Sequence, residues 1–183
     1  MLLYHGSNKL FHQFKIKKEL SNYNESSLME GLGIYMTEDK HIAEGYGAYI
    51  YEVEIFDKDV LDSTDVEEMK SIIECISNKV NFDIKEMIDI DDLVLGVKEG
   101  EISVTKLYKE INDLLDSDER LYIEYSDRLT EDEDDLFYQI EKTYLEIIPP
   151  IIKYYDKCLG TVYICIREEN KISIKDVISA DIA

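Results

Sequence analysis

Two tyrosines, Tyr35 and Tyr46, are spaced so that their rings could hold a flat heterocycle between them. The short apolar run 31–36 opens with two glycines, which predicts a buried strand with Tyr35 at its end. Thr37 and the charged residues behind it are typical of a helix cap, and Tyr46 comes 11 residues after Tyr35, on the helix. Rings carried by such a strand–turn–helix unit could face each other across a slot. The alternative is that both are ordinary core aromatics.

A second set of candidate residues, His5-Gly6-Ser7, closes an apolar strand predicted over residues 2–7. His5 is either a buried histidine bonded to a backbone carbonyl or a ligand for a ribose hydroxyl of a nucleotide. Gly6 permits close approach of backbone to a ligand because it has no Cβ, and Ser7 would help to hold the turn. The tyrosine pair in the same chain favours the binding interpretation.

The order His-Gly-Ser, then Gly-x-Gly-Ile-Tyr, then Ala-x-x-Tyr resembles the His-Tyr-Glu branch of the ADP-ribosyltransferase superfamily, which includes the poly(ADP-ribose) polymerases and small bacterial and phage transferases. The 11 residues between the tyrosines and the 30 between His5 and Tyr35 match that family. The segment Tyr49–Ile55 looks like the next core strand. The resemblance covers about the first third of the chain.

This resemblance implies NAD as substrate and a role for each matched residue. His5 would hold a ribose, the backbone of Gly6 would pair with the nicotinamide carboxamide, and Tyr35 and Tyr46 would enclose the nicotinamide ring. Ala43 stands where the polymerases have a serine that bonds the amide, so that hydrogen bond is absent here.

A transferase of this kind also needs a carboxylate. Cleavage of the nicotinamide–ribose bond passes through an oxocarbenium-like state, which a carboxylate near the developing charge stabilises. The family's glutamate aligns with Thr161 or Val162, so the chain departs from the pattern. Asp156, in a predicted turn before the strand 161–166, is the best replacement, because the stretch 156–165 looks like the end of a small ADP-ribosylating anti-CRISPR protein. The alternative is that Asp156 only forms the turn; the further candidates are Glu54, Glu124 and Glu146.

The rest of the pattern predicts an α+β fold, an ADP-ribosyltransferase-like split β-sheet in a single domain of 183 residues with a helical insertion at about 58–149. Capping boxes at 64–67 and 130–133 each precede an amphipathic stripe. The prolines at 149 and 150 end the last helix, and strands are expected at 151–155, 161–166 and 171–177. The segment 20–27 has the composition of a loop. Three cysteines without metal-ligand spacing predict reduced, mostly buried thiols and no metal site.

Charge is concentrated in the middle of the chain. The net charge is −21, of which −17 falls in residues 58–149, against −4 in 1–57 and 0 in 150–183. Such a field repels nucleic acid and attracts basic surfaces, although a merely solvated surface has the same composition. No apolar run is long enough to span a membrane and no secretory signal is recognisable, so we expect a cytoplasmic protein.

Three hypotheses follow from the sequence. The first is a mono-ADP-ribosyltransferase that transfers ADP-ribose from NAD to a protein with a basic surface, as a phage counter-defence (anti-CRISPR) factor or a bacterial toxin. The second is a catalytically inactive family member that acts by contact. The third is an acidic DNA mimic that blocks a nucleic-acid-binding groove, which would leave His5, Tyr35 and Tyr46 unexplained.

Overall fold

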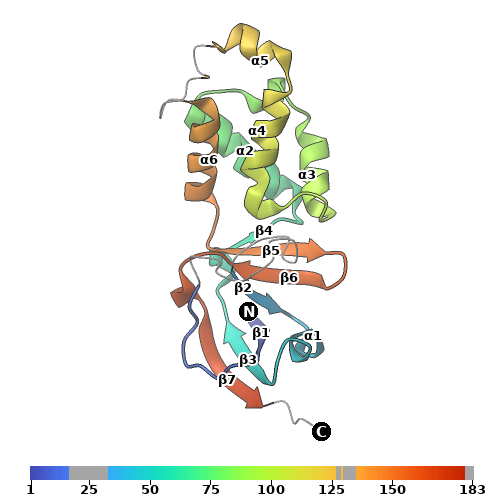
Figure 1. Cartoon of the computed structure of the whole chain (residues 1–183), viewed down its shortest axis with the longest axis vertical. Helices are drawn as coiled ribbons and strands as arrows, with labels where there is room; N and C mark the ends of the chain where they lie inside the picture. The colour runs from blue at the N-terminus through green and yellow to red at the C-terminus, as the bar shows by residue number, and fades with distance from the viewer. Residues whose placement is uncertain (17–32, 127–128, 130–134, 180–183) are drawn as a thin grey trace. The chain divides into compact units, whose positions relative to one another are not determined.

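The computed structural model describes residues 1–16, 33–126, 129 and 135–179. These form two compact units, one of Met1–Asp62 with Pro149–Ala183 and one of Ser63–Ile148 (Figure 1). The loop expected at 20–27 and the capping box at 130–133 lie outside the described residues.

The first unit is built on a seven-stranded sheet in the order β4-β5-β6-β2-β1-β3-β7. All neighbouring strands are antiparallel except β4 and β5, which are parallel. The strands are β1 Leu2–Ser7, β2 Ile34–Thr37, β3 Tyr49–Glu54, β4 Val60–Asp62, β5 Ile151–Asp156, β6 Gly160–Cys165 and β7 Ser173–Ser179. Six of the seven were predicted, from short apolar runs, from alternation or from the resemblance; β4 was missed, because its three residues are too few to display a pattern.

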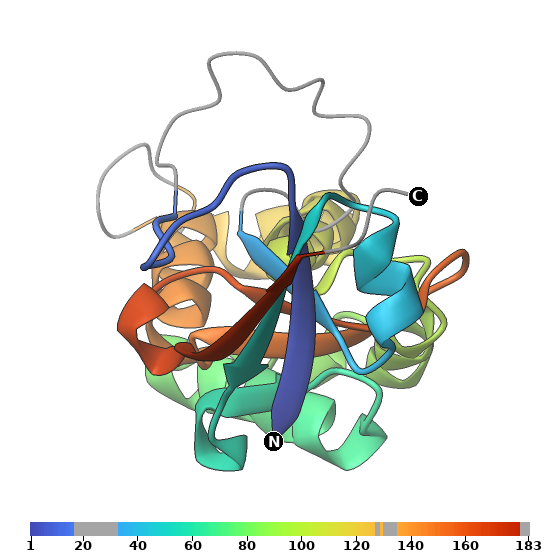
Figure 2. The ribbon, with the colours of Figure 1, turned by 90° about the horizontal axis from the view of Figure 1, so that it is seen from below.

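Alternation along the strands divides the sheet into two faces. One face carries a closed apolar core that includes Leu3, Met36, Val53, Tyr163 and Cys165. The opposite face carries the short helix α1, Lys40–Glu44, which contacts β1, β2 and β3 (Figure 2). Side chains of neighbouring residues on one strand therefore lie on opposite faces of the sheet.

The second unit is helical, with α2 Val66–Val80, α3 Ile90–Lys98, α4 Leu107–Asp116, α5 Glu119–Glu124 and α6 Leu136–Ile147. Aspartates cap four of these helices, because a carboxylate oxygen can accept the free N–H groups of a first turn: Asp65, Asp89, Asp118 and Asp135. The capping box at 64–67 was therefore placed one residue early, since Asp65 and not Thr64 is the N-cap. Asp135 is likewise the N-cap of α6.

The α+β class is thus confirmed, whereas the ADP-ribosyltransferase-like core remains a prediction. The helical unit begins at Ser63, so residues 58–62 of the predicted insertion belong to the sheet unit. Of the thiols, Cys165 is buried and Cys75 half-buried, but Cys158 is exposed, which corrects the expectation for that residue. No helix in the described ranges is long and apolar enough to cross a membrane.

Candidate functional site

The strand–turn–helix unit predicted around Tyr35 is present, but its cap is a different residue and Tyr46, expected on the helix, lies in the turn after it. Thr37 is the last residue of β2, and its Oγ1 accepts a hydrogen bond from the N–H of Asp39 at 3.1 Å. Asp39 is the N-cap of α1 and accepts the N–H of His41 at 2.8 Å. The prediction of Thr37 as the cap was wrong, because β2 extends to Thr37 through its pairing with Val162.

Gly6 lies directly against the back of α1. A Cβ at this position would collide with the carbonyl oxygen of Ala43 and lie 2.9 Å from the Cβ of Tyr46. The absence of a side chain at Gly6 therefore lets α1 approach β1 and brings Tyr46 beside it. This packing role is a second reason for glycine here, in addition to the ligand approach inferred from the sequence.

Tyr35 shares this face of the sheet. β1 and β2 pair at Tyr4 and Thr37, and extending this antiparallel register by two residues places Tyr35 opposite Gly6. Tyr35 is half-buried, whereas the Tyr46 side chain is 55% exposed. The structure thus brings Gly6, Tyr35 and Tyr46 together on the α1 face.

Ser7 has a local role at the end of β1. Its Oγ accepts the N–H of Lys9 at 3.1 Å, which holds the turn as expected from the sequence.

His5 lies on the other face, as strand alternation requires for the neighbour of Gly6. Its ring packs against Phe11, Phe14 and Tyr51, with centroid distances of 6.2, 5.1 and 6.0 Å. Its Nδ1 lies 2.7 Å from the carbonyl oxygen of Tyr35. A carbonyl can only accept, so Nδ1 carries the proton, and burial lowers the pKa of His5.

The neutral ring therefore has its lone pair at Nε2, where a hydroxyl group could donate to it. Both interpretations of His5 are compatible with this geometry: it is bonded to a backbone carbonyl, and it retains one acceptor atom.

A pair that the sequence did not suggest lies on the same face as His5. The hydroxyl of Tyr163 donates to Glu38 Oε1 at 2.6 Å, and burial together with this carboxylate raises the pKa of Tyr163. Glu38 directly follows Thr37, which pairs with Val162, one of the two positions at which the family glutamate is expected. Glu38 and Tyr163 are 125 residues apart in the chain, and only the order of the strands makes them neighbours.

Asp156 occupies the tip of the β5–β6 hairpin. Its Oδ1 accepts the N–H groups of Cys158 at 2.8 Å and Leu159 at 2.9 Å, so its carboxylate holds the turn. It lies two strands from Tyr35 and four residues further along the sheet, since Ile164 pairs with both Tyr35 and Ile152. Strand spacings of about 4.8 Å and rises of about 3.3 Å per residue put their Cα atoms on the order of 15 Å apart. The structure does not bring Asp156 to the Tyr35–Tyr46 pair.

The other candidate carboxylates from the sequence are Glu54, Glu124 and Glu146. Glu54 pairs with Lys175 at 2.6 Å, and Lys175 lowers the pKa of Glu54. Glu146 is exposed on α6, and the side chain of Glu124 lies outside the described ones.

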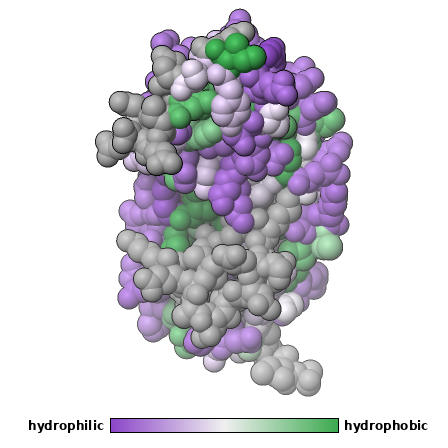
Figure 3. All heavy atoms as spheres, turned by 45° about the horizontal axis from the view of Figure 1, so that its top comes forward, coloured by the Kyte–Doolittle hydropathy of each residue, from purple (hydrophilic) through white to green (hydrophobic). Residues whose placement is uncertain are grey.

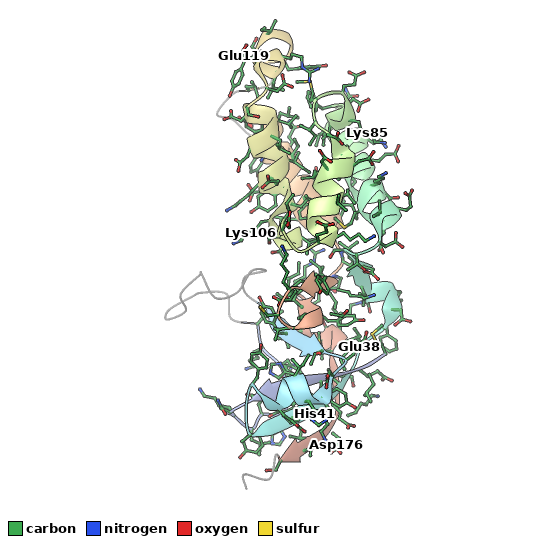
Figure 4. All side chains as sticks on the ribbon, turned by 90° about the vertical axis from the view of Figure 1, so that its right-hand side faces the viewer. Glu38, His41, Lys85, Lys106, Glu119 and Asp176 are labelled. Carbon is green, nitrogen blue, oxygen red and sulfur yellow. The ribbon has the colours of Figure 1, made fainter. Side chains whose placement is uncertain are left out.

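His41 is solvent-exposed on α1, as expected from the sequence (Figure 4). Within residues 1–16, 33–126, 129 and 135–179, no group of three His, Cys, Asp or Glu side chains could hold a metal ion.

Comparison with known proteins adds little to this geometry. No family model matches the sequence, and no curated protein is similar to it. Among solved structures, a crystal structure described as that of an anti-CRISPR protein matches with 12% identity and a TM-score of 0.41, over 97% of this chain and 95% of the other. A similarity this distant carries no argument about the function of this chain.

Proposed function

We propose that this protein is a mono-ADP-ribosyltransferase that transfers ADP-ribose from NAD to a protein with a basic surface. The observation that carries the proposal is the meeting of Gly6, Tyr35 and Tyr46 on the α1 face of the sheet. Two aromatic rings beside the backbone of a glycine suit a planar, amide-bearing ring such as nicotinamide. His5 lies on the opposite face of the sheet, so its role as acceptor of a ribose hydroxyl at Nε2 follows from the resemblance and not from this meeting.

In the proposed reaction, the bond between the ribose C1′ and the nicotinamide nitrogen breaks, and nicotinamide leaves with the bonding electron pair. An acceptor group of the target protein forms the new bond to C1′ and loses a proton. A carboxylate would stabilise the developing cation. Asp156 is the candidate from the sequence pattern, and Glu38 is the candidate from its place next to Thr37, which pairs with Val162.

The test is to incubate the purified protein with NAD and to quantify released nicotinamide. Tyr46→Ala should abolish release without unfolding the protein, because the side chain is largely exposed. Tyr155→Ala is the matched control, since Tyr155 is 42% exposed on β5 and has no place in the proposed site. Equal release from wild type and Tyr46→Ala, or no release together with no binding of NAD by calorimetry, would contradict the proposal.

A second candidate function is action by contact alone, as an inactive family member or an acidic mimic of DNA. It is favoured by the two turn hydrogen bonds that Oδ1 of Asp156 accepts. Contact action predicts that inhibition of the target persists without NAD and in the Tyr46→Ala variant. Inhibition that requires NAD would exclude it. A counter-defence role and a toxin role are both compatible with either function.

A further inference from the structure

We propose that a groove in the helical unit is a docking site for a basic segment of a partner protein that carries an apolar anchor side chain. The groove lies among α3, α4, the start of α5 and the turn that precedes α3, and has a volume of about 560 Å³. All of its lining residues belong to Ser63–Ile148, so the site lies within one compact unit. The inference rests on the proposed action on a protein target, but not on any chemistry with NAD.

The floor of the groove is apolar and fixed by packing. It consists of Met87, Ile88, Leu93, Ile102 and Leu114. Ile102 reaches this floor because Gly96 on α3 has no side chain: a Cβ there would lie 2.7 Å from Ile102 Cδ1. The N–H of Ile102 also donates to the carbonyl of Gly96 at 3.0 Å. A floor held in this way is preformed, which lowers the entropic cost of binding.

The rim of the groove is acidic. It carries five carboxylates, and none of its described lining residues is lysine or arginine. Asp89 caps α3, and Asp118 caps α5 and pairs with Arg120 at 2.6 Å. The remaining three, Asp92, Glu110 and Glu119, have no ion pair within the described ranges. They are therefore available to cations of a partner.

The occupant follows from this combination of charge and apolar surface. A row of unpaired carboxylates above an apolar floor is complementary to lysine or arginine side chains that flank an aliphatic or aromatic residue. The same rim repels the phosphates of nucleic acid.

The apolar surface continues beyond the groove on α5. Ile123 is 79% exposed and lies four residues after Glu119, hence on the same side of that helix. Figure 4 shows Glu119 at one end of the helical unit, and Figure 3 shows a hydrophobic group among hydrophilic residues at that end.

The binding of synthetic peptides tests the proposal. The probe is a fluorescently labelled peptide of about four helical turns, with leucine on one face and lysine on the other, measured by anisotropy at low salt without NAD. Neutralising Asp92→Asn, Glu110→Gln and Glu119→Gln together should weaken its binding by about tenfold. Leu114→Ser should weaken it by at least about tenfold, because it removes part of the floor.

Matched controls separate the groove from the overall charge. The triple variant Glu86→Gln, Glu99→Gln and Asp113→Asn removes the same charge from exposed positions of the same unit and should change affinity by less than about twofold. Leu95→Ser, at a position 47% exposed on α3, is the control for Leu114→Ser. Circular dichroism and melting temperatures confirm that each variant is folded.

Three results would overturn the proposal: no binding of the leucine–lysine peptide, equal losses in the two triple variants, or equal binding of a peptide with serine in place of leucine. These results leave nicotinamide release untouched, so a failed groove and a failed transferase are distinguishable. Loss of nicotinamide release with retained peptide binding would contradict only the transferase.

Discussion

The Nδ1 atom of His5 lies 2.7 Å from the carbonyl oxygen of Tyr35, while the side chains of the two residues point to opposite faces of the sheet. The two motif residues are thus joined through a ring and a backbone group. This arrangement fixes the imidazole as a donor at Nδ1, and burial, which lowers the pKa of His5, favours the neutral ring.

The first prediction concerns the pH dependence of stability. In the unfolded chain His5 binds a proton near pH 6.5, whereas in the folded chain it does so only at a lower pH. The neutral His5 therefore makes its full contribution to the free energy of unfolding above pH 6.5, and this contribution is lost as the pH falls towards the pKa of the folded state. The free energy of unfolding of wild type should therefore fall relative to His5→Asn between about pH 7 and pH 5, by at most about 1.4 kcal/mol per pH unit. Asparagine can still donate to Tyr35 but does not titrate.

Urea denaturation at several pH values measures this difference. The pKa of His41 is raised by Glu44, which gives the opposite dependence, but His41 is present in both proteins and its effect cancels. Parallel stability curves for wild type and His5→Asn would contradict the assignment of a neutral, buried His5.

The second prediction compares two glycines that adjoin α1: Gly6, on β1, and Gly45, at the end of the helix. Gly6→Ala should destabilise the protein by about 1–3 kcal/mol, because the new Cβ collides with the carbonyl of Ala43 and must displace the helix. Gly45→Ala is the control: its φ is −66° and the nearest atom to an added Cβ is 3.3 Å away, so alanine should be neutral or slightly stabilising. Thermal unfolding of both variants checks the pair, and equal stabilities would show that α1 does not rest on Gly6 as described.

The third prediction separates the two candidate carboxylates. Asp156→Asn keeps an oxygen that can accept from Cys158 and Leu159, so its stability should stay within about 0.5 kcal/mol of wild type, whereas Asp156→Ala should lose about 1 kcal/mol. If nicotinamide release is observed, Glu38→Gln should lower it more than Asp156→Asn, since Glu38 adjoins the Thr37–Val162 pair whereas the Asp156 carboxylate holds a turn. Complete loss of release in a fully stable Asp156→Asn would instead support the prediction from the sequence.

Part of the fold and part of the candidate site could be predicted from the sequence. The strands β1 and β5 were predictable because each is a short apolar run beside a turn, and β3 was predictable from its resemblance to the family's core strand. The helical unit was predictable because its acidic residues stand between apolar stripes. The site was predictable only in part: the meeting of Gly6, Tyr35 and Tyr46 follows from local spacing and one strand pair.

The remaining relationships depend on strand order and register, which local patterns do not determine. The Tyr163–Glu38 hydrogen bond requires β6 to lie beside β2, and the face of His5 depends on the register between β1 and β2. Nothing local distinguishes Asp156 as a turn residue from Asp156 as a catalytic one, since both roles favour an aspartate after a strand.

The fourth prediction concerns Tyr51, whose hydroxyl anchors the segment that packs on His5. It accepts the N–H of Phe11 at 2.7 Å and donates to the carbonyl of Lys9 at 3.0 Å, and the Phe11 ring stacks on Tyr51 with centroids 4.1 Å apart. Tyr51→Phe leaves both backbone groups without this partner, so the free energy of unfolding should fall by about 1–3 kcal/mol. Tyr155→Phe, at an exposed position, should change it by less than about 0.5 kcal/mol.

Hydrogen exchange at the amide of Phe11 gives the sharper measurement, because that N–H donates directly to the Tyr51 hydroxyl. Its protection should fall in Tyr51→Phe and persist in Tyr155→Phe. Since Phe11 and Phe14 enclose the His5 ring, loosening this segment should also move the pKa of His5 towards its ordinary value of 6.5. An unchanged His5 titration in Tyr51→Phe, followed by NMR, would show that the ring is held by the sheet alone.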